Sequence, residues 1–160
     1  AMTESYERQA REKLDFAVAN YGGIRINAVA AGDLTLGKMY EIMPFENQLV
    51  VMDLNGVQVK QLLDRIATYG GWPVSEGLQF EIRDSAAINI LIQGAPWKPE
   101  GSYRIGLPDY VANGGDDCDF LKPLPRVNSG LLIRDLLISD VKRKKVLTPN
   151  GQVRIKQTQP

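Results

Sequence analysis

The chain has 160 residues, of which 44% are hydrophobic, and its 19 basic residues balance 19 acidic ones. This length and apolar content suit one domain with a core of its own, and the balanced charge gives no reason to expect binding to nucleic acid or to a membrane surface. The chain contains no histidine and one cysteine. This excludes Ser-His and Cys-His catalytic pairs, an internal disulfide and a Cys/His zinc site, so we expect little catalytic capacity in this chain alone.

The N-terminal part is predicted to begin with a helix. The opening Ala1-Met2 is typical of residues left by cloning, so the native N-terminus is expected to differ. Residues 4–17 are rich in helix formers and predict a helix, whereas "FAVAN" (16–20) can instead form a short buried strand that runs into two glycines. No apolar run approaches the roughly 18 residues that a membrane-spanning helix needs.

A helix, a strand and a second helix are predicted next. Residues 35–42 predict a short helix, with Asp33 or Thr35 accepting hydrogen bonds from its free N–H groups. "QLVVMDL" (48–54) is a β-branched apolar run, which indicates a strand covered on both faces. Asn55 can cap the amphipathic helix that follows.

The rest of the chain alternates between the hydrophobic periodicity of strands and that of helices. We predict strands over 78–83, 88–94 and 102–108, a helical turn over 108–115 and an amphipathic helix over 129–145. The polar tail after residue 145 shows no repeat, and no linker or second domain is visible. The mixed order predicts one domain over residues 1–160 with an α+β (mixed α/β) fold of layered helices and mixed sheets.

The stretch "NYGGIR" (20–25) places two glycines beside an arginine. Glycines permit a tight turn and close approach of a ligand to the backbone, and exposed N–H groups in such a turn can bind an anion. The guanidinium of Arg25 has the fork geometry that suits phosphate oxygens. The alternative is a structural turn in which Arg25 pairs with a nearby carboxylate.

Two loop aromatics are the other candidates for a site. Phe45 in "MPFEN" and Tyr110 in "DYVANGGDD" can stack on a planar base, with Asp116 accepting from ribose hydroxyls. The alternative for both rings is ordinary packing in the core. The cluster of Asp116, Asp117 and Asp119 is more typical of an exposed acidic turn than of a metal site, and we assign no metal ligand.

Taken in order, these stretches resemble the C-terminal domain of the 5′-nucleotidase / UDP-sugar hydrolase family. The family pattern is N-x-G-G-I-R, then P-F-x-N before a buried strand and helix, then a tyrosine strand that leads into aromatic-x-A-x-G-G-D. Here it reads "NYGGIR", "PFENQLVVMDLNGVQVKQLL" and "SYRIGLPDYVANGGDD". The closing "GQVRI" is also similar, and the likeness covers roughly residues 15–155.

The resemblance implies a nucleotide-binding domain that works beside a calcineurin-like metallophosphoesterase domain. That domain, in the same or a separate chain, would hold two divalent metal ions, while this chain would hold no cofactor. The partner molecule would be an AMP-like nucleotide or nucleoside, and the location would be periplasmic or extracellular. The implied site consists of two rings around the base, an arginine at the phosphate, an asparagine and a glycine backbone near the base, and an aspartate at the ribose: Phe45, Tyr110, Arg25, Asn20, Gly23 and Asp116.

Three positions depart from the family pattern. Tyr21 stands where a third glycine is usual, and Asp117 and Cys118 replace the usual glycine and aromatic. A side chain at position 21 is expected to narrow the pocket or to change the loop, and a carboxylate at position 117 would repel a phosphate ester if it points inward. These departures favour an alternative, a non-catalytic interaction module that kept the fold and lost nucleotide binding. A self-sufficient hydrolase with a carboxylate-bound metal is the remaining alternative.

Overall fold

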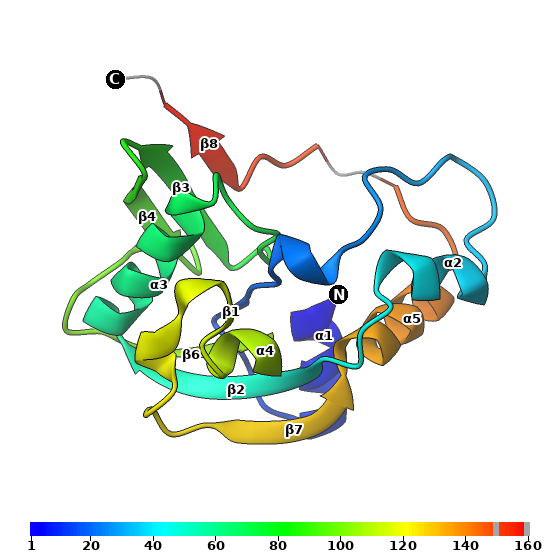
Figure 1. Cartoon of the computed structure of the whole chain (residues 1–160), viewed down its shortest axis with the longest axis horizontal. Coiled ribbons are helices and arrows are strands. Elements are labelled where there is room, and N and C mark those ends of the chain that lie inside the picture. The colour runs from blue at the N-terminus through cyan, green and yellow to red at the C-terminus, as the bar shows by residue number, and fades with distance from the viewer. Residues whose placement is uncertain (149–150, 159–160) are drawn as a thin grey trace.

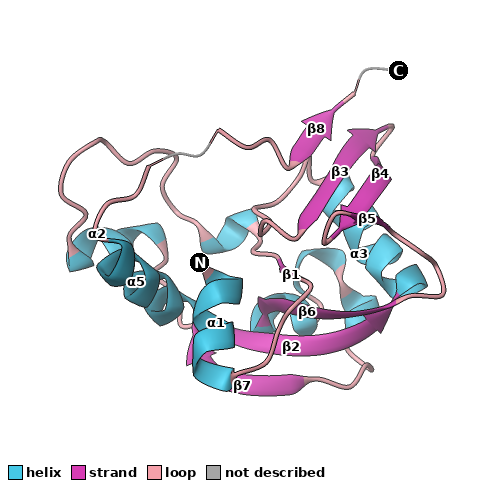
Figure 2. Ribbon diagram, turned by 180° about the vertical axis from the view of Figure 1, so that it is seen from behind, coloured by secondary structure: helices cyan, strands magenta, loops and turns pink. Residues whose placement is uncertain are grey.

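The structure, a computed structural model, describes residues 1–148 and 151–158. Its strands form two four-stranded sheets (Figures 1 and 2), one with the order β1-β6-β2-β7 and one with the order β5-β4-β3-β8. Both sheets mix parallel and antiparallel pairs, and the helices pack against them, which confirms the α+β prediction. The helices are α1 Met2–Ala10, α2 Leu36–Ile42, α3 Gly56–Thr68, α4 Asp109–Ala112 and α5 Ile133–Lys144. The strands are β1 Phe16–Ala17, β2 Gln48–Asn55, β3 Leu78–Arg83, β4 Ala86–Ile92, β5 Ala95–Pro96, β6 Ser102–Pro108, β7 Val127–Leu132 and β8 Ile155–Gln157.

Strand β2 is buried on both faces, as its apolar run predicts. Val50, Met52 and Leu54 point into the larger core, which also contains side chains of the second sheet, α3 and α4. Leu49 and Val51 point the other way, into a smaller core with side chains of α1 and α5. The two cores therefore place helices on opposite faces of the first sheet (Figures 1 and 2).

Side-chain caps set the starts of two helices. Asn55 Oδ1 accepts from the Gln58 N–H at 2.9 Å, and Gln58 accepts from the Asn55 N–H at 3.0 Å, so a reciprocal capping box begins α3. Of the two candidates for the cap of α2, Asp33 and Thr35, the structure uses Thr35, which accepts from the Lys38 N–H at 3.2 Å.

The predicted helix over residues 4–17 is wrong beyond Ala10. Arg11 adopts a left-handed conformation (φ 58°) that ends α1, and Phe16–Ala17 pair in parallel with β6. The strand alternative for this stretch is therefore confirmed. Helix propensity is a local quantity, and here it is overridden by pairing with a strand almost 90 residues away.

Later elements also differ from the prediction. The helix predicted over 129–145 is split, because residues 127–132 form β7 against β2 and α5 starts only at Ile133. The strand predicted over 88–94 ends at Ile92, since Gln93 and Gly94 turn with positive φ. Strand β8 in the tail was not predicted, and residues 149–150 and 159–160 of that tail lie outside the described part.

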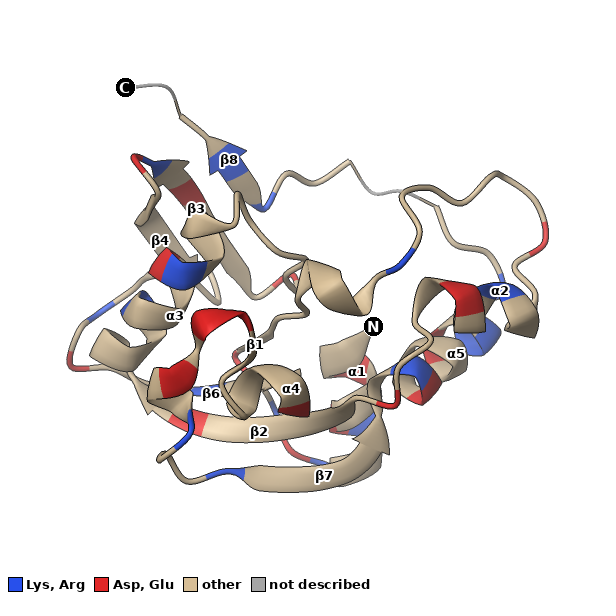
Figure 3. Ribbon diagram, viewed as in Figure 1, with Lys and Arg blue, Asp and Glu red and all other residues tan. Residues whose placement is uncertain are grey.

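Basic and acidic residues are interspersed along the helices, strands and loops of the described chain (Figure 3). In residues 1–148 and 151–158, no helix has the length and hydropathy that a bilayer crossing requires.

Candidate functional site

Three loops meet at one edge of the first sheet. Strand β1 runs parallel to β6, and β6 runs antiparallel to β2. The carboxyl ends of β1 and β6 therefore lie beside the amino end of β2. This geometry brings together residues 20–25, which follow β1, residues 43–47, which precede β2, and residues 109–117, which follow β6.

The three loops enclose a cavity of about 290 Å³. It is lined by Asn20, Gly22, Gly23, Arg25, Phe45, Asn47, Tyr110 and Asp116. All six residues singled out in the sequence are in this lining. Gly22 and Asn47 were not singled out, although both belong to the motifs, as the first motif glycine and the asparagine of P-F-x-N.

The two rings are exposed at the cavity and are not core residues. Phe45 is 41% exposed and Tyr110 is 48% exposed, so the core-packing alternative is wrong for both. The Arg25 guanidinium lies 4.8 Å from the centroid of the Phe45 ring, within range of a cation–π contact. A Cβ at Gly115 would lie 2.3 Å from the Tyr110 ring, so the ring can occupy this position only because residue 115 has no side chain.

Arg25 carries a charge that has no acidic partner within the described residues. Its backbone N–H donates to the Ile42 carbonyl at 2.9 Å, while its side chain is exposed and lies over Phe45. The alternative in which a neighbouring carboxylate neutralises Arg25 is therefore not what the structure has. The guanidinium is available to an anion that enters the cavity.

A hydrogen-bonded chain connects the loop after β1 to the loop after β6. Asn20 Nδ2 donates to Asp116 Oδ2 at 2.6 Å, and the Tyr110 hydroxyl donates to Asp116 Oδ1 at 3.4 Å. Asn20 is only 2% exposed, and its Oδ1 atom is buried without a hydrogen-bond partner in the described residues. Such an acceptor is costly unless a donor reaches it.

The glycines of "NYGGIR" are needed because a side chain there would crowd its neighbours, and not because the backbone has a conformation that favours glycine. Residues 21–23 form a short 3-10 turn, and neither Gly22 nor Gly23 has a positive φ. A Cβ at Gly22 would lie 3.1 Å from Asn20 Nδ2, and one at Gly23 would lie 3.4 Å from Asn20 Oδ1. The glycines thus leave room for the buried Asn20 amide and keep the cavity wall thin.

None of the three departures from the family pattern lines this cavity. Tyr21 is 59% exposed and lies outside the lining. The Asp117 carboxylate accepts from the Tyr69 hydroxyl at 2.9 Å and lies 3.8 Å from Arg65 at the end of α3. Cys118 is fully buried, and burial raises the pKa of its thiol to about 12. The expectation that Tyr21 narrows the pocket is therefore wrong, and the Asp117 carboxylate is not part of the cavity lining.

The acidic turn does not have the arrangement of a metal site. Asp116 binds Asn20, Asp117 binds Tyr69, and Asp119 pairs with Lys122 at 2.6 Å. Across residues 1–148 and 151–158, no group of three acidic or cysteine side chains is placed to hold a metal ion.

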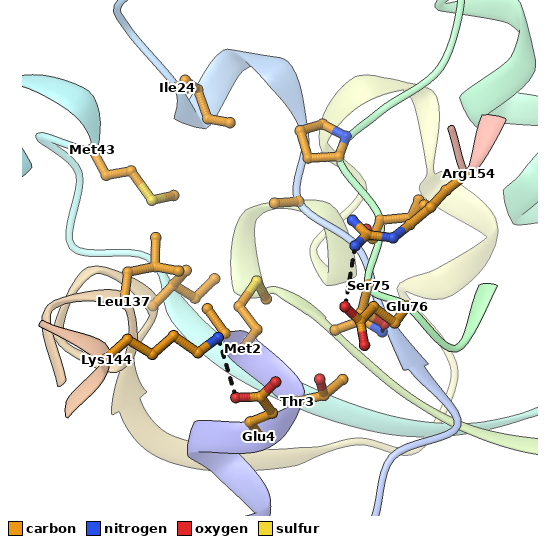
Figure 4. A pocket seen from close by; sticks show the side chains of 16 residues that line it. Met2, Thr3, Glu4, Ile24, Met43, Ser75, Glu76, Leu137, Lys144 and Arg154 are labelled. Atoms are coloured by element: carbon orange, nitrogen blue, oxygen red, sulfur yellow. Dashed lines mark hydrogen bonds and ion pairs between the residues drawn. The ribbon is translucent and has the colours of Figure 1, made fainter. Parts of the chain in front are cut away.

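A second cavity, of about 400 Å³, is lined in part by residues of the same loops (Figure 4). Ile24 and Met43 line it, whereas their neighbours Arg25 and Phe45 line the first cavity. Ion pairs, among them Glu4 with Lys144 at 3.4 Å, lie at its edge (Figure 4). Adjacent residues of the same loops thus line two different cavities, which the sequence did not indicate.

This geometry defines the class of the protein: an α+β domain with a cavity built from loops at the ends of strands. The chain belongs to the family described as "5′-nucleotidase, C-terminal domain", whose pattern matches residues 1–123. It is similar to the 5′-nucleotidase of Vibrio cholerae serotype O1, with 32% identity over 132 residues that cover 79% of this chain and 24% of that protein. It is also similar to the Silent protein UshA(0) of Salmonella typhimurium, with 30% identity over 90% of this chain and 28% of that protein.

Solved structures share the fold. The 5′-nucleotidase precursor from Thermus thermophilus matches with a TM-score of 0.85 and 29% identity over 98% of this chain and 34% of that one. The NAD nucleotidase of Haemophilus influenzae matches with a TM-score of 0.78 at 19% identity, which shows the fold alone. The chain spans about a quarter of the length of the sequence relatives named above.

Proposed function

We propose that this chain is the substrate-binding domain of a 5′-nucleotidase. It recognises the base, ribose and phosphate of an AMP-like nucleotide, and a separate metallophosphoesterase domain hydrolyses the phosphate ester. The observation that carries this proposal is that three motifs, far apart in sequence, place two exposed rings and an unpaired arginine in the lining of one cavity.

The base would stack on Phe45 and Tyr110. Stacking of a base on an aromatic side chain contributes on the order of 1–3 kcal/mol. The Asn20 amide and the backbone at Gly23 lie in the same lining. A donor on the base would satisfy the unpaired Oδ1 atom of Asn20, if the side chain turns it toward the ligand.

The ribose and phosphate of the nucleotide would bind to groups that can still form hydrogen bonds or ion pairs. Arg25 offers its guanidinium to the phosphate oxygens. Asp116 already accepts from Asn20 and Tyr110, but a carboxylate has about four acceptor sites. Two sites would therefore remain for ribose hydroxyls.

Catalysis is assigned to the other domain. The acidic side chains of residues 116–119 do not fit a metal ion, because each is bound to a different neighbour, so no step of hydrolysis is derived from this chain. The two divalent metal ions, the catalytic domain that holds them and a periplasmic or extracellular location rest on family membership.

Calorimetry with AMP and adenosine tests the proposal. Arg25→Ala is expected to weaken AMP about tenfold or more, because a hydrogen bond to a charged group contributes about 1.5–3 kcal/mol, and to change adenosine affinity little. Phe45→Ala is expected to weaken both ligands. Arg83→Ala is the control, since this exposed arginine lies in β3 outside the cavity lining. Absence of binding by the wild-type chain at millimolar AMP would contradict the proposal.

A further inference from the structure

Arg134 is a buried cation with no carboxylate partner within the described residues. It is 5% exposed, and its Nη1 atom donates to the carbonyls of Met43 at 3.4 Å and Pro44 at 3.2 Å. Its guanidinium lies 4.0 Å from the centroid of the Tyr40 ring. Among residues 1–148 and 151–158, the contacts of this charge are therefore two backbone carbonyls and one ring.

Stability alone does not explain an arginine at this position. Burying a charge costs several kcal/mol unless it is fully paired, and a cation in the first turn of α5 lies at the positive end of the helix dipole. Both carbonyls that Arg134 binds directly precede Phe45. The contact of Arg134 therefore fixes the turn between α2 and the ring that lines the cavity.

Asp109 holds the same loop from its other end. Its Oδ1 atom accepts from the Gln48 N–H at 3.2 Å and from the Tyr110 N–H at 2.9 Å. Gln48 begins β2, three residues after Phe45. One carboxylate oxygen therefore connects the segment that carries one ring to the residue that carries the other.

We propose that Arg134 and Asp109 are positioning residues that set the separation of the Phe45 and Tyr110 rings before a base enters. This inference rests on the proposed function. Fixing the rings in advance removes the ordering cost that a ligand would otherwise meet on binding. Arg134 lies outside residues 1–123, the part that matches the family pattern.

Replacement of Arg134 by methionine is the main test, because a side chain of similar length without charge often leaves a fold as stable as before. For Arg134→Met we expect an unchanged or higher melting temperature and about tenfold weaker AMP binding. The amplitude of the ultraviolet difference spectrum that arises when the base stacks on the rings should decrease. Affinity for ribose 5-phosphate, which has no base, should stay unchanged. The control is Arg154→Met, an arginine that donates to the Val74 carbonyl away from this cavity.

Asp109 provides a second, independent pair of variants. Asp109→Asn keeps an acceptor oxygen and is expected to bind AMP almost as the wild type does, whereas Asp109→Ala is expected to bind several-fold more weakly. If Arg134→Met does not fold, this pair carries the test.

Each outcome has a distinct meaning. Wild-type AMP affinity in Arg134→Met, or equal weakening of AMP and ribose 5-phosphate, would overturn the inference and leave the proposed function standing. Failure of the wild-type chain to bind AMP would instead contradict the proposed function.

Discussion

Asp116 and Asp117 are adjacent, share a left-handed backbone and send their carboxylates to different sites. Their φ values are 52° and 59°, a region that glycine adopts without strain. Asp116 lines the cavity, whereas Asp117 binds Tyr69 and approaches Arg65. Equivalent substitutions at the two positions therefore distinguish effects on the backbone from the loss of a contact with a ligand.

Substitution by glycine should change the AMP affinity at position 116 and leave it nearly unchanged at position 117. Asp117→Gly relieves the backbone and removes only exposed contacts, so we expect AMP affinity within about twofold of wild type and a change in stability below about 1 kcal/mol. Asp116→Gly gives the same backbone relief but removes the carboxylate assigned to the ribose, and AMP should bind about tenfold more weakly. Calorimetry on both variants checks this, and equal affinities would contradict the role of Asp116.

Gly115 is expected to control the position of the Tyr110 ring. In Gly115→Ala the new Cβ would lie 2.3–2.5 Å from three ring atoms of Tyr110, so the ring must move and AMP affinity should fall about tenfold. Gly37→Ala is the matched control, since its Cβ would meet only Thr35 Oγ1 at 3.9 Å. The control should stabilise α2 by about 0.5–1 kcal/mol and leave binding unchanged. An unaffected AMP affinity in Gly115→Ala would show that Tyr110 does not stack on the base.

At the scale of elements, the capping box of α3 gives a prediction about stability alone. Asn55→Ala removes the side-chain acceptor of the Gln58 N–H but keeps the backbone N–H of residue 55 that donates to the Gln58 side chain. We expect a loss of about 1 kcal/mol, or a melting temperature lower by roughly 2–4 °C for a chain of this size. Gln61→Ala, at an exposed position of α3, should change little. Thermal unfolding of both variants distinguishes the cap from general effects on the helix.

The elements that could be predicted from sequence are those whose signal is local. The apolar run of β2, the alternation of β3 and the cap and periodicity of α3 each lie within one short window of residues. By contrast, β1, β7 and β8 are strands because of partners far away in the chain. Leu132 has the i, i+4 helical spacing with Leu136, yet "SGLL" (129–132) belongs to the strand that pairs with β2, and the chain bends at Gly130, which has a φ of 72°.

The candidate site could be located for a similar reason. Its lining comes from three short motifs, so resemblance at each motif was enough to name six of eight lining residues. Asn47 belonged to the P-F-x-N motif and could have been added. Arg134 and Asp109 act through backbone atoms of other loops, and no sequence pattern marks such contacts.

At the scale of the whole molecule, ion pairs join α1 at the start of the chain to α5, more than 130 residues later. Arg143 and Lys144, in the last turn of α5, pair with Asp140 and with Glu4 of α1. Ser5 adds a hydrogen bond to the Leu136 carbonyl at 3.2 Å. The basic run "KRKK" (142–145) thus contributes two side chains to the packing of α1 on α5.

Asp140 makes this attachment dependent on pH. Burial alone would raise the pKa of its carboxyl, but hydrogen bonds from Arg143 and Lys144 outweigh burial and lower the pKa below the ordinary value of 3.8. A lowered native pKa means that the stabilisation is complete above about 3.8 and is lost as the pH falls through the native value.

Asp140→Asn is therefore expected to lower the free energy of unfolding by about 1–3 kcal/mol at neutral pH. Its difference from the wild type should shrink as the pH falls from about 4 through the lowered native pKa, because the wild-type carboxyl becomes protonated over that range. Urea unfolding of both proteins across this range measures the effect. Asp135→Asn is the control, since Asp135 is exposed in the first turn of the same helix and should cost only a few tenths of a kcal/mol. A difference that stays constant from neutral to acidic pH would mean that Asp140 stabilises the fold through its shape and not through its charge.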